Sequence, residues 1–186
     1  MRRAADAARI ATFVEQLGRA ARGAATCYLV GGATAVWYGW RESAIAVDIY
    51  LEPAADELLR EIQRLKERLE INVELASPAD FIPELPGWRD RSPFVGRYGK
   101  LTVRHYDLYA QALAKIERGH RLDRIDVAEM LRRGLVDGER LRAFFEAVEP
   151  LLYRYPALDA VSFRQRLAAA LGSDRRLEGR PDGWAG

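Results

Sequence analysis

The sequence predicts an α/β (α+β) protein, in which a mixed β-sheet carries helices on its faces and an α-helical lobe follows at the C-terminal end. Four short β-prone runs predict strands at 26–30, 47–51, 71–75 and 101–106. Apolar residues at helical spacing occupy most of the remaining chain, and they are the main periodic signal after Asp107. With 186 residues, 49% of them apolar and 30% charged, the chain can bury a core.

Charge and cysteine content narrow the functional classes. The net charge is only +2, so the whole molecule exerts no strong attraction on nucleic acid, and any binding surface must be a local patch. The single cysteine, Cys27, excludes an internal disulfide, suits a reducing cytosol and is expected to be a small buried side chain. The N-terminal residues contain no long apolar segment, so we expect no signal peptide, no membrane contact and a cytoplasmic location.

The first third of the chain predicts helix, strand, glycine turn and helix in succession. An amphipathic helix is expected over roughly 4–22, and the strand at 26–30 runs directly into Gly31 and Gly32. Glycines can adopt positive φ and leave no Cβ between the backbone and a ligand. A short helix over 33–40 follows, whose N-terminal N–H groups favour a phosphate, and Arg41-Glu42-Ser43 then forms a turn.

The strand at 47–51 carries one carboxylate on its polar face. Val47, Ile49 and Leu51 alternate with Asp48 and Tyr50. Position 46 shares the face of Asp48, and two carboxylates at such spacing can share divalent ions, but Ala46 stands there. A charged amphipathic helix is expected over 54–69. The strand at 71–75 then presents Asn72 and Glu74 opposite its apolar side chains.

Prolines and glycines between 78 and 100 predict a segment without regular structure. Its cations interleave with Trp88, Phe94 and Tyr98, a mixture that binds phosphates and stacks bases, or equally one in which aromatic rings pin a loop to the core. We expect pinning for Trp88 and Phe94. We expect a nucleic-acid or nucleotide contact for the arginines, Arg89, Arg91 and Arg97.

Helices fill the C-terminal part. Asp107 is a suitable N-cap for a helix over 108–118, which carries Lys115, and Asp126 follows eleven residues later. Further amphipathic helices are predicted at 137–148 and 159–171. The polar residues 173–186 are expected to be frayed or disordered, which gives a core over 1–106, a helical lobe over 107–172 and a tail.

The segment 28–51 (YLVGGATAVWYGWRESAIAVDIYL) resembles the nucleotidyltransferase superfamily with a polymerase-β-like core. It looks closest to the small prokaryotic branch related to AbiEii- and MenT-type toxins, and the resemblance extends over 26–171. Members carry Gly-Gly or Gly-Ser after the first strand and a Mg²⁺-binding Asp-x-Asp pair on the second. The pair falls here on Ala46-Val47-Asp48, so the second aspartate is present and the first is alanine.

The resemblance implies a role for each candidate residue. Asp48 and Glu74 would bind Mg²⁺, and Ala46 marks the position of the missing catalytic aspartate. Lys115 and Asp126 would complete the catalytic site from consecutive helices, with Asp126 orienting Lys115 or a metal-bound water. The NTP phosphates would be bound by a larger set: Gly31, Gly32, Thr34, Arg41, Ser43 and Lys115.

The resemblance also implies a Mg²⁺-dependent transfer of a nucleotidyl group from an NTP to an acceptor, with tRNA as the family-level expectation. The protein would then be a toxin with a cognate antitoxin as partner. Two alternatives stay open: a catalytically dead module that binds nucleotide, RNA or a partner protein, and an enzyme that AMPylates proteins. The rest of the site is intact, which favours recent loss or an engineered substitution at Ala46 over long decay.

Overall fold

The computed structural model describes residues 2–178, with side chains described up to Gly172. The described chain forms two compact units. The sheet unit comprises the chain up to Asp80 together with Gly87–Asp107, and the helical unit comprises Phe81–Pro86 and the chain from Leu108 onwards. Within the described residues, no helix combines the length and the apolar character that crossing a membrane requires.

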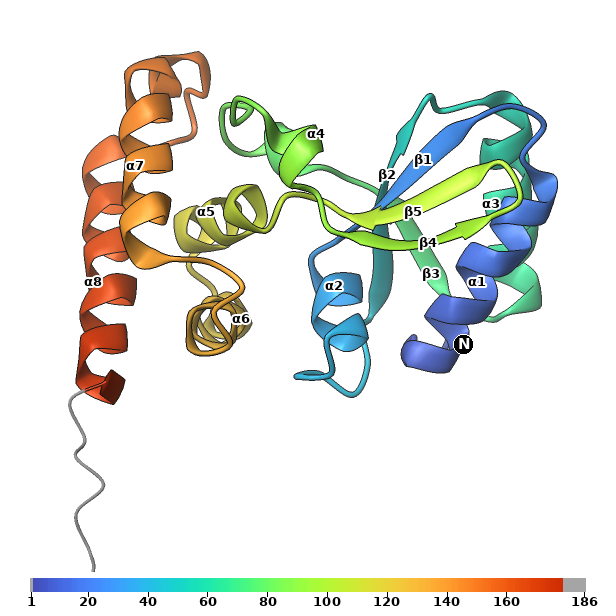
Figure 1. The fold of residues 1–186 in the computed structure, drawn as a ribbon, viewed down its shortest axis with the longest axis horizontal. Helices are drawn as coiled ribbons and strands as arrows, with labels where there is room; N and C mark the ends of the chain where they lie inside the picture. Colours follow the sequence, from blue (N-terminus) through green and yellow to red (C-terminus); the bar gives the residue numbers. More distant parts are fainter. Residues whose placement is uncertain (1, 179–186) are drawn as a thin grey trace, which may run out of the picture. The chain divides into compact units, whose positions relative to one another are not determined.

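The sheet unit is built on a five-stranded mixed sheet (Figure 1). The strand order is β3-β2-β1-β5-β4. Strands β1 and β5 are parallel, as are β2 and β3, whereas β1–β2 and β4–β5 are antiparallel. The prediction of a mixed sheet is therefore confirmed. The bounds of the strands are β1 Ala25–Val30, β2 Ala46–Glu52, β3 Asn72–Leu75, β4 Phe94–Tyr98 and β5 Leu101–His105.

Strand β4 overturns the prediction that 78–100 has no regular structure. The segment contains a 3₁₀ turn (η1, Pro78–Asp80), a short helix (α4, Trp88–Arg91) and β4 itself. Strand β4 pairs with β5 across a two-residue turn at Gly99-Lys100, a connection that suits a tight hairpin. Prolines interrupt only the first part of the segment, and the hairpin after Pro93 supplies the missing backbone partners.

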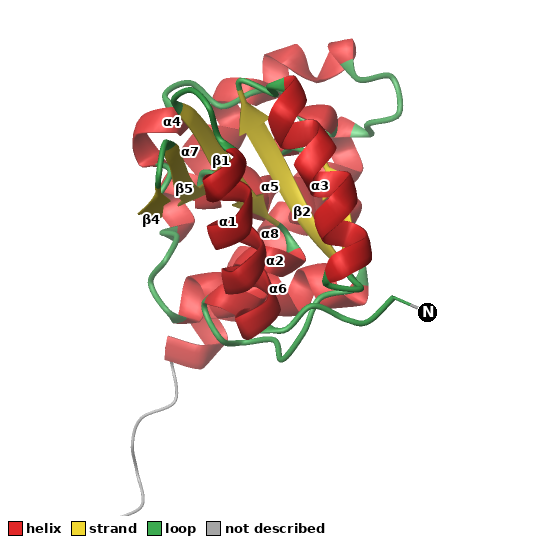
Figure 2. Cartoon of the chain, turned by 90° about the vertical axis from the view of Figure 1, so that its right-hand side faces the viewer, coloured by secondary structure: helices red, strands yellow, loops and turns green. Residues whose placement is uncertain are grey.

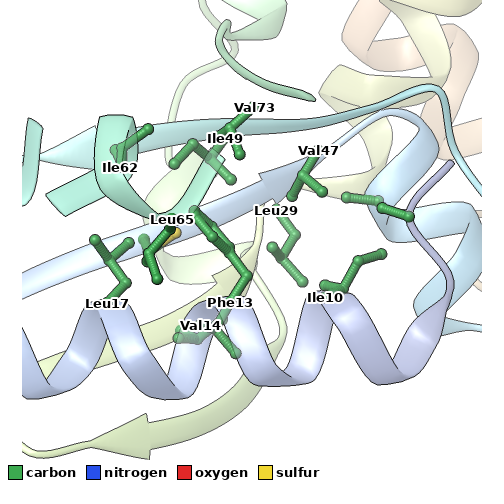
Figure 3. Close-up of a cluster of buried hydrophobic side chains, with 14 of the residues drawn as sticks. Ile10, Phe13, Val14, Leu17, Leu29, Val47, Ile49, Ile62, Leu65 and Val73 are labelled. Carbon is green, nitrogen blue, oxygen red and sulfur yellow. The ribbon is translucent and has the colours of Figure 1, made fainter. Parts of the chain in front are cut away.

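One face of the sheet packs against helices α1 (Ala7–Ala20) and α3 (Asp56–Arg68), which cover it in Figure 2. Figure 3 shows how their apolar side chains interlock with those of the strands. Asp6 caps α1, since its carboxylate accepts a hydrogen bond of 2.9 Å from the Arg9 backbone N–H. Cys27 is fully buried in this core, as predicted, and burial raises the pKa of its thiol to about 12.

The opposite face carries an aromatic cluster of Tyr28, Tyr50, Trp88 and Tyr106. The Trp88 ring stacks on Tyr106 with centroids 4.1 Å apart and is 2% exposed, so the predicted pinning of Trp88 is confirmed. The prediction is wrong for Phe94, which is 61% exposed. Phe94 begins the edge strand β4, next to a register shift, where no further strand covers it.

The helical unit consists of α5 (Leu108–Arg118), α6 (Arg121–Arg132), α7 (Gly138–Val148), the 3₁₀ helix η2 (Glu149–Arg154) and α8 (Ala160–Glu178). Asp137 caps α7 by accepting from the Arg140 backbone N–H. Helix α8 runs to Glu178, so the predicted fraying is wrong for 173–178, where arginine, leucine and glutamate favour helix. The rest of the predicted tail, 179–186, lies outside the described residues.

Candidate functional site

The structure brings Asp48 and Glu74 together on the sheet. Strands β2 and β3 are parallel and in register, with Asp48 opposite Glu74 and Ala46 opposite Asn72. All four side chains lie on the face opposite the buried Val47 and Val73. Neighbouring strands lie about 4.8 Å apart. The two carboxylates therefore project side by side from one face.

The glycine turn lies against the Asp48 carboxylate. Gly31 adopts φ +58°, which favours glycine, and a Cβ built on it would lie 3.1 Å from Asp48 Oδ2. A Cβ on Gly32 would lie 2.9 Å from the Cβ of Ala44 and 3.8 Å from Arg41 Nη1. Glycine is thus favoured at position 31 by its positive φ and at position 32 by the close approach of Ala44.

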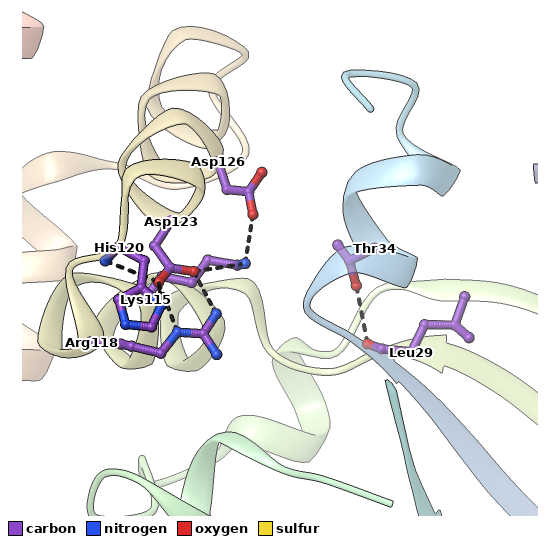
Figure 4. A network of polar contacts seen from close by, with 7 residues as sticks. All are labelled: Leu29, Thr34, Lys115, Arg118, His120, Asp123 and Asp126. Carbon is purple, nitrogen blue, oxygen red and sulfur yellow. Dashed lines mark hydrogen bonds and ion pairs between the residues drawn. The ribbon is translucent and has the colours of Figure 1, made fainter. Parts of the chain in front are cut away.

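Two of the predicted phosphate ligands occupy different environments. Ser43 is exposed in the loop that precedes β2. Thr34, in the short helix α2 (Gly32–Trp37), is fully buried. Its hydroxyl donates to the Leu29 carbonyl oxygen at 3.1 Å (Figure 4), and His105 Nδ1 lies 3.1 Å from Thr34 Oγ1. Thr34 therefore fastens α2 to the end of β1, and we remove its hydroxyl from the set of candidate nucleotide ligands.

His105 is buried like Thr34, and its environment predicts how the stability of the fold depends on pH. A hydroxyl has one hydrogen, which Thr34 gives to Leu29, so His105 must donate through Nδ1–H. The imidazole is 2% exposed, and burial lowers its pKa from 6.5 to about 4. The unfolded chain takes up this proton near pH 6.5 and the folded protein only near pH 4. The neutral imidazole thus stabilises the fold fully above pH 6.5, and this contribution is lost as the pH falls to about 4.

We expect the free energy of unfolding to decrease by about 3 kcal/mol between pH 7 and pH 4 through this group alone. Urea titrations across that range measure it. His105→Gln should flatten the pH dependence, whereas His120→Gln, at an exposed position, should keep the slope of the parent protein. Equal slopes in the parent and the His105 variant would contradict the assignment.

The helical unit brings Lys115 and Asp126 together in a buried network (Figure 4). Lys115 Nζ lies 2.6 Å from Asp126 Oδ2 and 3.6 Å from Asp123 Oδ1. Arg118 donates to both oxygens of Asp123, at 2.6 and 2.7 Å. Burial by itself raises the pKa of Asp123, but hydrogen bonds from Arg118 and the charge of Lys115 outweigh it and hold this pKa below its usual value.

Asp123 was not predicted to belong to this network, although its spacing from Asp126 indicated it. Asp123 and Asp126 are three residues apart on α6 and therefore share one helix face. Both side chains are almost completely buried, at 1% and 0% exposure. His120 occupies the N-cap of α6, and its backbone N–H donates to Asp123.

Two of the three arginines that were predicted to contact nucleic acid form ion pairs within the protein. Arg89 donates to both carboxylate oxygens of Glu52, at 2.6 and 2.9 Å, and lies over the Trp88 ring. Arg91 pairs at 2.6 Å with the buried Asp107. Arg97 is exposed on β4 and donates to the Gly99 carbonyl oxygen. A nucleic-acid contact thus stays a prediction for Arg97, whereas for Arg89 and Arg91 it would compete with these ion pairs.

The carboxylates fit one metal ion better than two. No group of three or more histidine, cysteine, aspartate or glutamate side chains in the described part of the chain is arranged to hold a metal ion. Asp48 and Glu74 supply two carboxylates, and Mg²⁺ is commonly held by one or two carboxylates together with phosphate oxygens and water. The donor set therefore fits one Mg²⁺ that arrives with a nucleotide, and Ala46 leaves too few oxygens for a second ion.

Fold and site together define an α/β protein with a mixed sheet, whose face opposite α1 and α3 combines a glycine turn, paired carboxylates and a nearby arginine. Comparisons with protein-family models, curated proteins and solved structures find no match to this chain.

Proposed function

We propose that this chain is a nucleotidyltransferase-fold protein with a polymerase-β-like core, which binds an NTP and Mg²⁺ on the face of its sheet opposite α1 and α3. The observation that carries the proposal is the position of the Asp48 carboxylate. It lies in register with Glu74 on one side and within contact distance of the Gly31 turn on the other. A metal ligand beside a backbone turn that admits phosphate oxygens suits a metal–triphosphate complex.

The other groups of this face have matching chemistry. The Arg41 guanidinium lies near Gly32, and its planar fork matches phosphate oxygens. Ser43 offers an exposed hydroxyl that donates to phosphate. Bound Mg²⁺ would neutralise charge on the phosphates. Positioning and charge neutralisation account for most of the catalysis of phosphoryl transfer, so no protein nucleophile is needed.

In the proposed reaction, the oxygen of an acceptor hydroxyl forms a bond to the α-phosphorus of the NTP. The bond from that phosphorus to the bridging oxygen breaks, and pyrophosphate leaves. The acceptor hydroxyl loses its proton to a base, a role for which the carboxylate absent at position 46 would be the natural group. With Ala46 in place, we expect NTP binding and very little transfer.

The wider biological role rests on the resemblance alone. We propose tRNA as the acceptor, a toxin–antitoxin pair as the context and a cytoplasmic location. Lys115 and Asp126 remain predicted members of the catalytic site. Their buried ion pair also gives them a structural role, so Lys115→Ala is a poor test of nucleotide binding, because it leaves the buried Asp126 without its cation.

A second candidate function is a binding module without turnover. Ala46 favours it, as does the lack of a cluster of three or more potential metal ligands among the described residues. The two functions share the same NTP site and differ only in chemistry. A binding experiment therefore tests the site, and an activity experiment with a restored carboxylate separates the functions.

For the site, we expect Arg41→Ala to weaken Mg²⁺-NTP binding by about 1–3 kcal/mol, because it removes a charge-assisted contact to phosphate. Calorimetric titrations with each of the four NTPs measure the dissociation constant. Arg22→Ala is the matched control, since Arg22 is an exposed arginine of the same unit, in the connection between α1 and β1. Unchanged affinity in the Arg41 variant would remove this residue from the site.

A further inference from the structure

The helical unit contains a pocket of about 300 Å³, lined by residues of helices α5, α6 and α8 and by Gly119. Its volume is at the lower end of the range for small-molecule sites. The residues that line it all belong to the helical unit. Its apolar walls come from Ile116, Val127, Ala128, Ala169 and Ala170.

Three cations line the same pocket, and they differ in how their charges are compensated. Lys115 is held by Asp126 and Asp123. Arg166 donates to the Glu117 carbonyl oxygen, and its charge also acts on the Glu117 carboxylate. The Arg124 guanidinium has neither a hydrogen bond nor an ion pair with any described residue, and the Arg124 backbone N–H donates to the His120 carbonyl oxygen. Arg124 is therefore the cation available to a ligand.

We propose that this pocket binds a small amphipathic organic anion, with the apolar body between the helices and the anionic group on Arg124. Charge complementarity supports an anion, because Asp123, the one carboxylate among the described residues that line the pocket, is already neutralised by Arg118 and Lys115. Small side chains on α6 and α8 leave room for the apolar body. A cation would meet Arg124 and Arg166 without a carboxylate to receive it.

A ligand bound in the pocket would contact residues of the buried ion pairs. Lys115 and Asp123 both line it and belong to the buried network that also contains Asp126. A ligand here would therefore restrain α5, α6 and α8 together. Because a ligand that binds only the folded state stabilises it, binding should also raise the melting temperature of the protein.

The test uses octanoate as the probe, with octanol and octylamine as neutral and cationic probes of the same length. Methyl NMR spectra of alanine-labelled protein report occupancy through Ala128, Ala169 and Ala170. We expect saturable shifts of these methyl groups with octanoate and roughly tenfold weaker binding of octanol, since a charge-assisted contact is worth about that factor. Octylamine should not bind.

Matched variants distinguish the contribution of the Arg124 charge to binding from that of the apolar cavity. Arg124→Gln should weaken octanoate roughly tenfold, whereas Arg121→Gln, on the same helix but outside the pocket, should not change the affinity. Ala170→Leu should fill the pocket and abolish binding, with the circular dichroism spectrum of the folded parent retained. Equal affinities for octanoate and octanol, an affinity unaffected by Arg124→Gln, or no saturable shift would each overturn the proposal.

Discussion

Replacing Ala46 by aspartate is expected to raise Mg²⁺-dependent nucleotidyl transfer by about a hundredfold or more. Position 46 opens β2 on the face of Asp48, and Asn72 is its neighbour on β3. A carboxylate there adds oxygens for a second ion and a group to receive the acceptor proton, and metal charge stabilisation is worth several kcal/mol in the transition state. Since Ala46 is only half-buried, the melting temperature should change little.

The measurement follows labelled NTPs into total tRNA and protein, with and without Mg²⁺. Ala46→Asn controls for shape without charge. Ile45→Asp places the same charge one residue earlier, at a position that is 82% exposed, and neither control should activate transfer. If the Ala46→Asp protein folds and binds NTP but labels no acceptor, the enzyme function is wrong and the binding module is favoured. Label in protein alone would favour AMPylation over tRNA modification.

Replacing Asp126 by alanine is expected to lower the free energy of unfolding by about 3 kcal/mol or more. Lys115 is 5% exposed, and without Asp126 its ammonium group would keep only the more distant Asp123, at 3.6 Å. A buried charge that loses its close partner is poorly solvated. Denaturant titrations measure the loss. Replacing both partners by apolar residues, as in Lys115→Met with Asp126→Leu, should recover much of it.

The matched control is Glu129→Ala on the same helix. Glu129 pairs with Arg132 and Arg133 at the surface, and exposed ion pairs are worth about 0–1 kcal/mol. A loss at Asp126 no larger than that at Glu129 would show that the buried pair does not stabilise the helical unit. In the Ala46→Asp background, a stable Asp126 variant that loses transfer would instead support the predicted catalytic role.

Short-range patterns determined most of the elements. β-Prone composition predicts β1, and alternation predicts β2, β3 and β5, all to within one residue at each end, because side chains that face a core recur every second residue along a strand. Helical spacing likewise predicts α1, α3 and α5. Strand β4 was not predicted, because Phe94 and Arg97 are both exposed on this edge strand and its side chains do not alternate clearly between buried and exposed.

The sequence by itself also determined that Gly31, Gly32 and Asp48 follow one another across a strand–turn–helix–strand unit. Only the tertiary structure decided that Glu74 is the register partner of Asp48, since strand neighbours and register are set by packing between distant segments. The structure likewise shows that Thr34 is buried within the fold and that Asp123 lies beside the Lys115–Asp126 ion pair. A residue's type shows which contacts it can make, and its distant neighbours decide which of them it makes.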